Sequence, residues 1–139
     1  MDQIKKERHA IRVKENPGLF ARAEKGDVKA IRALAYRYRK GEYLPKDLQK
    51  SIELYKKSAK GGYYKAQGDL GFMYSRGEGV TRDYVEAYAW MSASIKNGPE
   101  SWKKSFTFKR SGVEKRLSED ELARAILLAE KYCKYKLAP

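Results

Sequence analysis

The chain of 139 residues has little cysteine and no long apolar run. A single cysteine, Cys133, excludes an intrachain disulfide and favours a reducing, cytoplasmic setting. The opening stretch MDQIKKERHAIRVKE lacks the apolar core of a secretion signal. No apolar run approaches the roughly 20 residues that a membrane-spanning helix needs. We therefore expect a soluble, ordered, cytoplasmic protein without a membrane segment.

Residues with catalytic or metal-binding chemistry are equally scarce. The only histidine, His9, lies among Lys6, Glu7 and Arg8, as a solvated surface residue would. Cys133 falls on an apolar helical stripe, which predicts a packed thiol. No cluster has metal-ligand spacing, and neither a GxGxxG motif nor a phosphate-binding loop is present. We expect no enzymatic activity, no cofactor and no metal.

Acidic residues are too few to balance the basic ones. The chain has 31 Lys and Arg against 18 Asp and Glu, which gives a formal net charge of +13. Residues 1–62 carry 17 basic and 8 acidic residues, so the first half contributes most of this charge. A charge of this size biases encounters toward anionic partners, without specifying which anion.

An internal repeat with a period of 36 organises the middle of the chain. Residues 27–62 align with residues 63–98 without a gap and share ten identities, among them Leu34/Leu70, Tyr38/Tyr74, Gly41/Gly77 and Asp47/Asp83. Repeats of this length are typical of stacked supersecondary units. The chain, with 42% hydrophobic residues, is therefore expected to form a single repeat domain.

Each unit is predicted to contain two helices. Apolar residues recur every three or four positions, as in Ala30, Leu34 and Tyr38, so they share one face. Gly41 and Gly77 follow the first helix, where a left-handed residue satisfies the last carbonyls. Asp47 and Asp83 are placed to cap the second helix, and Asp83 with Glu86 predicts an acidic capping box. The second helices are predicted to end at Gly62 and Gly98.

The segment AQGDLGFMYSRGEGVTRDYVEAYAWMSASIKNG, residues 66–98, resembles a Sel-1-like repeat, a relative of the tetratricopeptide repeat. The first unit matches less well, because Tyr43 replaces the second glycine and Leu54 the tryptophan. Trp102 and Phe106 begin a third unit that then departs from the pattern. The resemblance implies an all-α protein, a right-handed α/α solenoid of about eight helices, and a role as a protein-binding adaptor.

Four segments complete this expected single domain of residues 1–139. They are an amino-terminal helix at about 2–15, repeats at about 27–62 and 63–98, a degenerate third unit at 99–116 and a capping helix at 118–136. Ser118 and Glu121 form a capping box at the start of the last helix. Two full units are few for a stack, so pairing of two copies through an exposed helical face is a further expectation.

The side of each first helix opposite the core suggests where a partner binds. At 100° per residue, positions 29, 32, 36, 39 and 40 form this arc, and the resemblance implies that it lines a concave groove. The fifteen arc positions of the three units contain no acidic residue. The candidate partner-binding residues are Lys29, Arg32, Tyr36, Arg39, Lys40, Lys65, Phe72, Arg76, Lys104 and Phe108.

Three interpretations of this arc remain open. Cations interleaved with the rings of Tyr36, Phe72 and Phe108 suit an acidic segment of a partner protein that also carries apolar side chains. The same chemistry suits single-stranded nucleic acid, whose phosphates pair with cations and whose bases stack on rings. The cations can also merely solvate an exposed face while the rings pack between repeats. We favour the protein partner, because no nucleic-acid motif is present.

Overall fold

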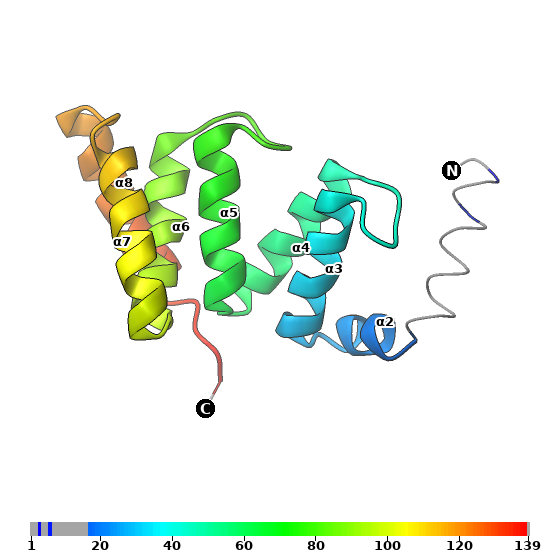
Figure 1. Ribbon diagram of the computed structural model, residues 1–139. Helices are drawn as coiled ribbons and strands as arrows, with labels where there is room; N and C mark the ends of the chain where they lie inside the picture. The colour runs from blue at the N-terminus through cyan, green and yellow to red at the C-terminus, as the bar shows by residue number, and fades with distance from the viewer. Residues whose placement is uncertain (1–2, 4–5, 7–16, 139) are drawn as a thin grey trace.

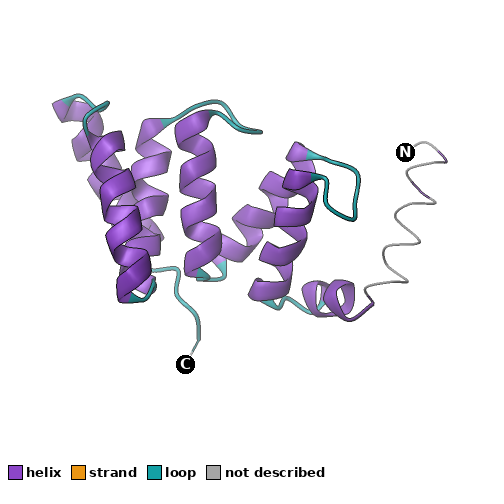
Figure 2. Ribbon diagram, in the orientation of Figure 1, coloured by secondary structure: helices purple, strands orange, loops and turns teal. Residues whose placement is uncertain are grey.

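A computed structural model describes residues 3, 6 and 17–138 of the chain (Figure 1). The helix expected at about 2–15, with His9 on it, lies outside the described residues apart from positions 3 and 6. All the regular structure in the described part is helical (Figure 2). The helices are α2 (Pro17–Glu24), α3 (Val28–Lys40), α4 (Leu48–Lys60), α5 (Tyr64–Arg76), α6 (Tyr84–Asn97), α7 (Glu100–Glu114) and α8 (Glu119–Tyr132).

The helices form a solenoid of antiparallel pairs. Helix α3 packs on α4, α5 packs on α6, and α4 packs on α5 to join the two pairs. Helix α6 then contacts both α7 and α8, so the last two helices share one support (Figure 1). The predicted all-α solenoid is confirmed.

The 36-residue register is visible in the hydrogen bonds within each pair. The Ser58 hydroxyl donates to the Val28 carbonyl at 2.6 Å, and the Ser94 hydroxyl donates to the Tyr64 carbonyl at 2.7 Å. Both bonds tie the end of a second helix to the start of the first, at equivalent positions of the two units. Because the hydroxyls are buried, these bonds satisfy polar groups that would otherwise destabilise the fold.

The predicted helix stops are confirmed at both glycines. Gly41 has φ of 71° and Gly77 has φ of 68°, the left-handed conformation that glycine adopts without strain. Their backbone N–H groups donate to the carbonyls of Arg37 and Met73. Each turn therefore closes its helix with the expected carboxyl-terminal cap.

The predicted aspartate caps are also confirmed, with one exception. Asp47 accepts from the Lys50 backbone N–H at 3.0 Å, and Asp83 accepts from the backbone N–H of Glu86 at 3.1 Å. The full capping box predicted for Asp83 and Glu86 is wrong. Its second bond would run from the Asp83 backbone N–H to the Glu86 carboxylate, but this N–H donates to the Tyr74 carbonyl. The Glu86 carboxylate accepts the Tyr132 hydroxyl at 2.8 and 3.0 Å.

Small residues allow close packing between the two helices of each pair. A Cβ atom on Gly71 would lie 2.9 Å from Cγ of Met91 and 3.1 Å from the Ala87 carbonyl oxygen. At the equivalent position of the first pair, Ala35 is fully buried and its carbonyl accepts the Ser51 hydroxyl at 2.8 Å. The predicted close approach at these positions is confirmed.

The helix expected over 118–136 is α8, which begins with the predicted capping box of Ser118 and Glu121. The sequence predicts an apolar stripe of Leu122, Ile126, Ala129 and Cys133 on this helix, and this is wrong in one member, because Ile126 is 44% exposed. Ala125 is buried in place of Ile126, beside the predicted Ala129, and Leu127 is 67% exposed. The stripe that packs on α6 therefore differs from the predicted one at a single position, and Ile126 and Leu127 remain on the exposed side of α8.

Candidate partner-binding surface

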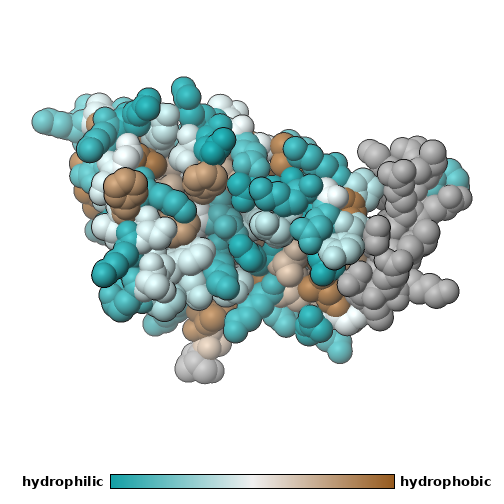
Figure 3. All heavy atoms as spheres, viewed as in Figure 1, coloured by the Kyte–Doolittle hydropathy of each residue, from teal (hydrophilic) through white to brown (hydrophobic). Residues whose placement is uncertain are grey.

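The ten candidate residues lie on the first helix of each pair or partial unit. Five belong to α3, Lys65, Phe72 and Arg76 belong to α5, and Lys104 and Phe108 belong to α7. Figure 3 shows the side of the molecule on which these helices lie, with polar residues over its middle and apolar patches over α5 and α7.

Two of the candidate arginines form ion pairs between the repeats. Arg32 Nε lies 2.8 Å from Oδ2 of Asp69. Arg39 donates to both carboxylate oxygens of Glu78, from Nε at 2.7 Å and from an Nη atom at 3.0 Å. The Arg39 side chain is only 10% exposed. These guanidinium groups already have anionic partners, so they bridge α3 to α5 and the loop after it.

The charges of these pairs alter the pKa values of neighbouring groups. Hydrogen bonds from Arg39 lower the pKa of Glu78, and they outweigh the opposing effect of its partial burial. Burial and the charge of Asp69 raise the pKa of Tyr55 to about 12, against the lowering effects of Arg39 and Arg32. The Tyr55 hydroxyl is buried without a well-formed hydrogen bond among the described residues. This side of the first junction is thus a compact polar cluster.

The predicted aromatic residues do not form one continuous ladder. The Arg32 guanidinium carbon lies 5.5 Å and the Lys40 ammonium 5.9 Å from the ring centre of Tyr36. Phe108 is 82% exposed and makes no ring or cation contact within the described segments. Phe72 lies between these two positions in the repeat order, and no direct ring contact joins it to Tyr36 or Phe108 in that part of the chain.

Phe72 is surrounded by cations from three helices. The distances from its ring centre are 5.9 Å to Arg39, 5.3 Å to Arg76 and 5.4 Å to Lys109. We call these four residues the Phe72 cluster. Positive charge over a ring face is favourable because of the negative potential of the π system. The cluster brings together three candidate residues and Lys109, which the sequence did not single out.

The remaining candidate cations lack a salt bridge in the part of the chain that the structure describes. Lys29, Lys40, Lys65, Arg76 and Lys104 make no salt bridge with any residue that the structure describes. The same is true of Lys109 in the Phe72 cluster. The predicted set therefore divides into two arginines bound within the fold and cations that remain available to an anion.

One predicted arc position is closed by packing. A Cβ atom on Gly68 would lie 2.7 Å from Cζ of Phe106 and 2.8 Å from the Ser94 hydroxyl oxygen. Phe106 is 4% exposed, and Trp102 stacks on it with ring centres 4.7 Å apart. Position 68 thus lies beneath the third unit, so the expectation that it lines an open groove is wrong.

The residues that sequence reasoning missed are Asp69, Glu78 and Lys109. Asp69 follows the arc position equivalent to Arg32, and Glu78 lies just beyond the end of α5. A charge of opposite sign at about the same height in the next repeat is the signal that could have revealed both pairs. Lys109 follows Phe108 in the sequence, and its proximity to Phe72 depends on how α7 lies beside α5.

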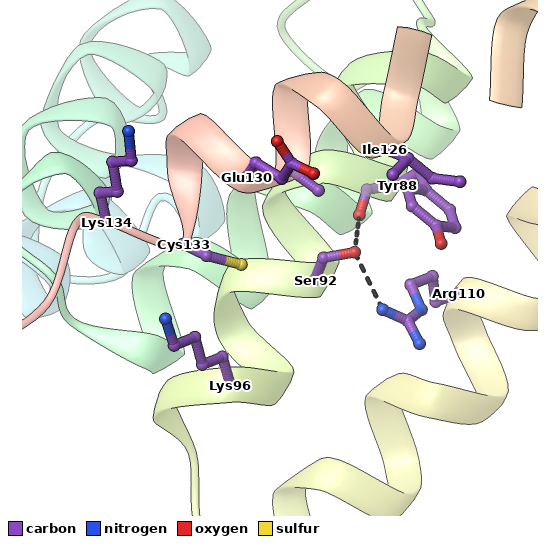
Figure 4. A pocket seen from close by; sticks show the side chains of 9 residues that line it. Tyr88, Ser92, Lys96, Arg110, Ile126, Glu130, Cys133 and Lys134 are labelled. Atoms are coloured by element: carbon purple, nitrogen blue, oxygen red, sulfur yellow. Dashed lines mark hydrogen bonds between the residues drawn. The ribbon is translucent and has the colours of Figure 1, made fainter. Parts of the chain in front are cut away.

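A separate cavity of about 450 Å³ lies between α6, α7 and α8 (Figure 4). Arg110 donates to the Ser92 hydroxyl at 3.0 Å and lies 5.2 Å from the Tyr88 ring centre. Burial raises the pKa of the Cys133 thiol, although Lys96 and Arg110 act in the opposite direction. The neutral thiol packs against the core, as predicted, and is a weak nucleophile.

Two further features are absent from the described part of the chain, a metal site and a membrane-spanning helix. Its histidine, cysteine and carboxylate side chains form no group that could hold a metal ion. Of the helices described, none is both long and apolar enough to cross a membrane.

The fold and its 36-residue register define a helical repeat protein. A sequence model of the Sel1 repeat matches residues 28–63 and 65–99, so the chain belongs to the Sel1-repeat family. Sel1 repeats generally mediate binding between proteins, typically as non-catalytic scaffolds. Similarity to the mouse protein sel-1 homolog 2 is 35% identity over 81 residues, which cover 58% of this chain and 12% of the mouse protein.

Two solved structures share the fold. A protective antigen present in uropathogenic Escherichia coli strains, which displays an SLR fold, is 32% identical with a TM-score of 0.78. The match covers 84% of this chain and 24% of that one. A Sel1 repeat protein from Oxalobacter formigenes has 23% identity and a TM-score of 0.54, and the match covers 81% of this chain and 97% of that one. The chain thus spans about a quarter of the first neighbour and nearly the whole of the second.

Proposed function

We propose that the protein is a cytoplasmic, non-enzymatic adaptor that binds an acidic segment of a partner protein at the Phe72 cluster and the adjoining cations. The observation that carries this proposal is the ring of Phe72 with Arg76 and Lys109 beside it, neither of which forms a salt bridge in the described part of the chain. Carboxylates of a partner would pair with these two cations. Its apolar side chains would pack on Phe72 and on the exposed ring of Phe108.

The two internal ion pairs support this binding mode indirectly. Because Arg39 is held by Glu78, its guanidinium keeps a fixed position near Phe72. A fixed side chain loses less conformational entropy when a ligand binds. Arg32 and Arg39 are therefore assigned to positioning, whereas Arg76, Lys109, Lys104 and Lys40 are assigned to direct contact.

Charge reversal at the Phe72 cluster tests the proposal. A fluorescent hexapeptide that alternates glutamate with leucine and phenylalanine serves as the probe. The double variant Arg76→Glu and Lys109→Glu should weaken peptide binding by at least about tenfold, which corresponds to 1.4 kcal/mol. The matched control is Lys56→Glu with Lys57→Glu on α4, which makes the same change in net charge. Equal losses in both variants would show only nonspecific attraction and would overturn the proposal.

Single-stranded nucleic acid is the second candidate ligand, because the 82% exposed ring of Phe108 offers a stacking surface for a base. A random oligonucleotide of sixteen nucleotides, titrated at several salt concentrations, separates the two. Binding that is tighter than that of the acidic peptide, steeply dependent on salt and lost in Phe108→Ala would favour nucleic acid. Pairing of two copies is a separate prediction, for which the exposed Ile126 and Leu127 on α8 are the natural surface.

A further inference from the structure

The segment after α8 returns to the middle of the molecule. We call residues 134–138 the tail, which has no helix or strand in its last four residues and runs back past the lower end of α5 in Figure 1. Its backbone passes directly over Gly62, in the turn between α4 and α5. A Cβ atom on Gly62 would lie only 2.2 Å from the Lys136 carbonyl carbon and 2.4 Å from the Leu137 nitrogen. The tail therefore depends on a glycine at this position.

Two side-chain amides hold the tail by one main-chain carbonyl. The carbonyl oxygen of Tyr135 accepts from Nε2 of Gln67 at 3.0 Å and from Nδ2 of Asn97 at 3.0 Å. Gln67 is fully buried, and its second amide hydrogen goes to the Ala59 carbonyl at 3.1 Å. Its own oxygen accepts from Asn97 at 3.1 Å. The network thus recognises main chain, which any segment can supply, and its amides lose partners when the site is empty.

An aromatic wall recognises the side chain at the same point. The Trp90 ring stacks on the Tyr132 ring, with centres 3.9 Å apart and planes 18° apart. The Tyr135 ring adds to this stack, 6.0 Å from Trp90 and 15° from its plane. The Tyr132 hydroxyl is held by Glu86, which fixes the wall independently of the tail.

We propose that Gly62, Gln67, Trp90, Asn97 and Tyr132 form a peptide-docking site, the tail slot, which the tail occupies as an internal ligand. Its external ligand is a segment of a partner protein with an aromatic residue between acidic neighbours. The ligand needs an aromatic side chain because this side chain would stack at Trp90. It needs an extended main chain with a free carbonyl because the amides of Gln67 and Asn97 bind one. Acidic neighbours follow from charge, because the chain has a formal net charge of +13, to which Lys134 and Lys136 of the tail contribute. This site is separate from the Phe72 cluster, and the two proposals stand independently.

The tail competes with any external segment at high effective concentration. It is joined to α8 through the turn at Cys133 and Lys134, so its local concentration at the slot is on the order of millimolar or higher. An external segment therefore binds weakly to the intact chain and more tightly when the tail is absent. The tail thereby keeps the slot closed to weak ligands.

Removal of the tail tests the proposal with two fluorescent peptides, KYKLA, which is the tail sequence, and EYELA. The shortened chain ends after Cys133, so that the whole tail is absent. We expect it to bind EYELA at least about tenfold more tightly than the full chain does, and more tightly than it binds KYKLA. If the shortened chain is unfolded by circular dichroism, the full chain with Tyr135→Ala takes its place, and the same gain is expected. No gain in either variant, or tighter binding of KYKLA, would overturn the proposal.

Two control variants locate the bound peptide. In the shortened chain, Asn97→Ala should weaken the binding of EYELA by about 3- to 10-fold, the loss expected from removing one hydrogen bond. The matched change Gln49→Ala removes an exposed amide that donates to the Gly79 carbonyl at 3.4 Å, and it should leave binding unchanged. The pair Arg76→Glu and Lys109→Glu should weaken EYELA binding no more than Lys56→Glu with Lys57→Glu, which makes the same change in net charge. A clearly larger loss in the Arg76 and Lys109 pair would place the peptide on the Phe72 cluster and refute the tail slot.

Discussion

The first helices of the three units are joined in two different ways. Between α3 and α5 the bridges are ionic, from Arg32 to Asp69 and from Arg39 to Glu78. Between α5 and α7 the bridges are apolar, because Phe106 fills the space above Gly68. Arg32 and Gly68 are equivalent in the 36-residue register, so one position carries a long cation in one repeat and no side chain in the next.

This difference determines which cations remain available. At the ionic junction the arginines are used to hold the repeats together. At the apolar junction the packing of Trp102 and Phe106 holds the third unit, and Arg76 and Lys109 form no salt bridge with a residue that the structure describes. A basic surface in a repeat protein can thus be partly structural, and a repeat-by-repeat inspection of the acidic neighbours separates the two roles.

The largest expected effect is at the apolar junction. Phe106 is 4% exposed, so Phe106→Ala should lower the free energy of unfolding by about 3 to 5 kcal/mol through lost contacts and the cavity left behind. Phe108, two residues away and 82% exposed, is the matched control, and Phe108→Ala should change it by no more than about 0.5 kcal/mol. Urea unfolding followed by circular dichroism measures both. Similar losses would mean that the third unit does not dock through Phe106.

A smaller effect is expected at the ionic junction. Arg39→Ala removes two hydrogen bonds to a carboxylate and should cost about 2 kcal/mol of unfolding free energy, because both partners are partly buried. A double-mutant cycle with Glu78→Ala should give a coupling of about 1 to 2 kcal/mol, which falls as salt is added. Lys29→Ala is the control, because Lys29 lies on the same helix and forms no ion pair with a described residue. A coupling near zero would mean that the bridge is only a surface contact.

The sequence predicted features set by local chemistry. The stops at Gly41 and Gly77 and the caps at Asp47 and Asp83 depend on residues within one turn, so a linear pattern is sufficient. The repeat register predicted the solenoid for the same reason, since each pair contacts its neighbours in sequence.

Features that depend on the relative height of two helices were missed. Arg32 meets Asp69 and not the equivalent residue Gly68, and Arg39 meets Glu78 in the loop beyond α5. The end of α8 was missed because the YCKYK stretch continues the helical pattern. The helix stops at Tyr132, where the amides of Gln67 and Asn97 capture the Tyr135 carbonyl. Such tertiary partners override local helix propensity.

The smallest expected effect is a change in pH dependence at the ionic junction. Because Arg39 lowers the pKa of Glu78 in the folded chain, this carboxylate stabilises the fold above its unfolded pKa of 4.5, and that stability is lost as the pH falls through the lower folded value. Glu78→Gln should therefore cost about 1 kcal/mol at pH 7 and progressively less below pH 4.5. Urea unfolding of both proteins at pH 7, 5 and 3 measures this difference. Glu42, at the equivalent position of the first repeat, makes no salt bridge among the described residues. Glu42→Gln should leave the acid response unchanged, and a response equal to that of Glu78→Gln would contradict the assignment to the Arg39 bridge.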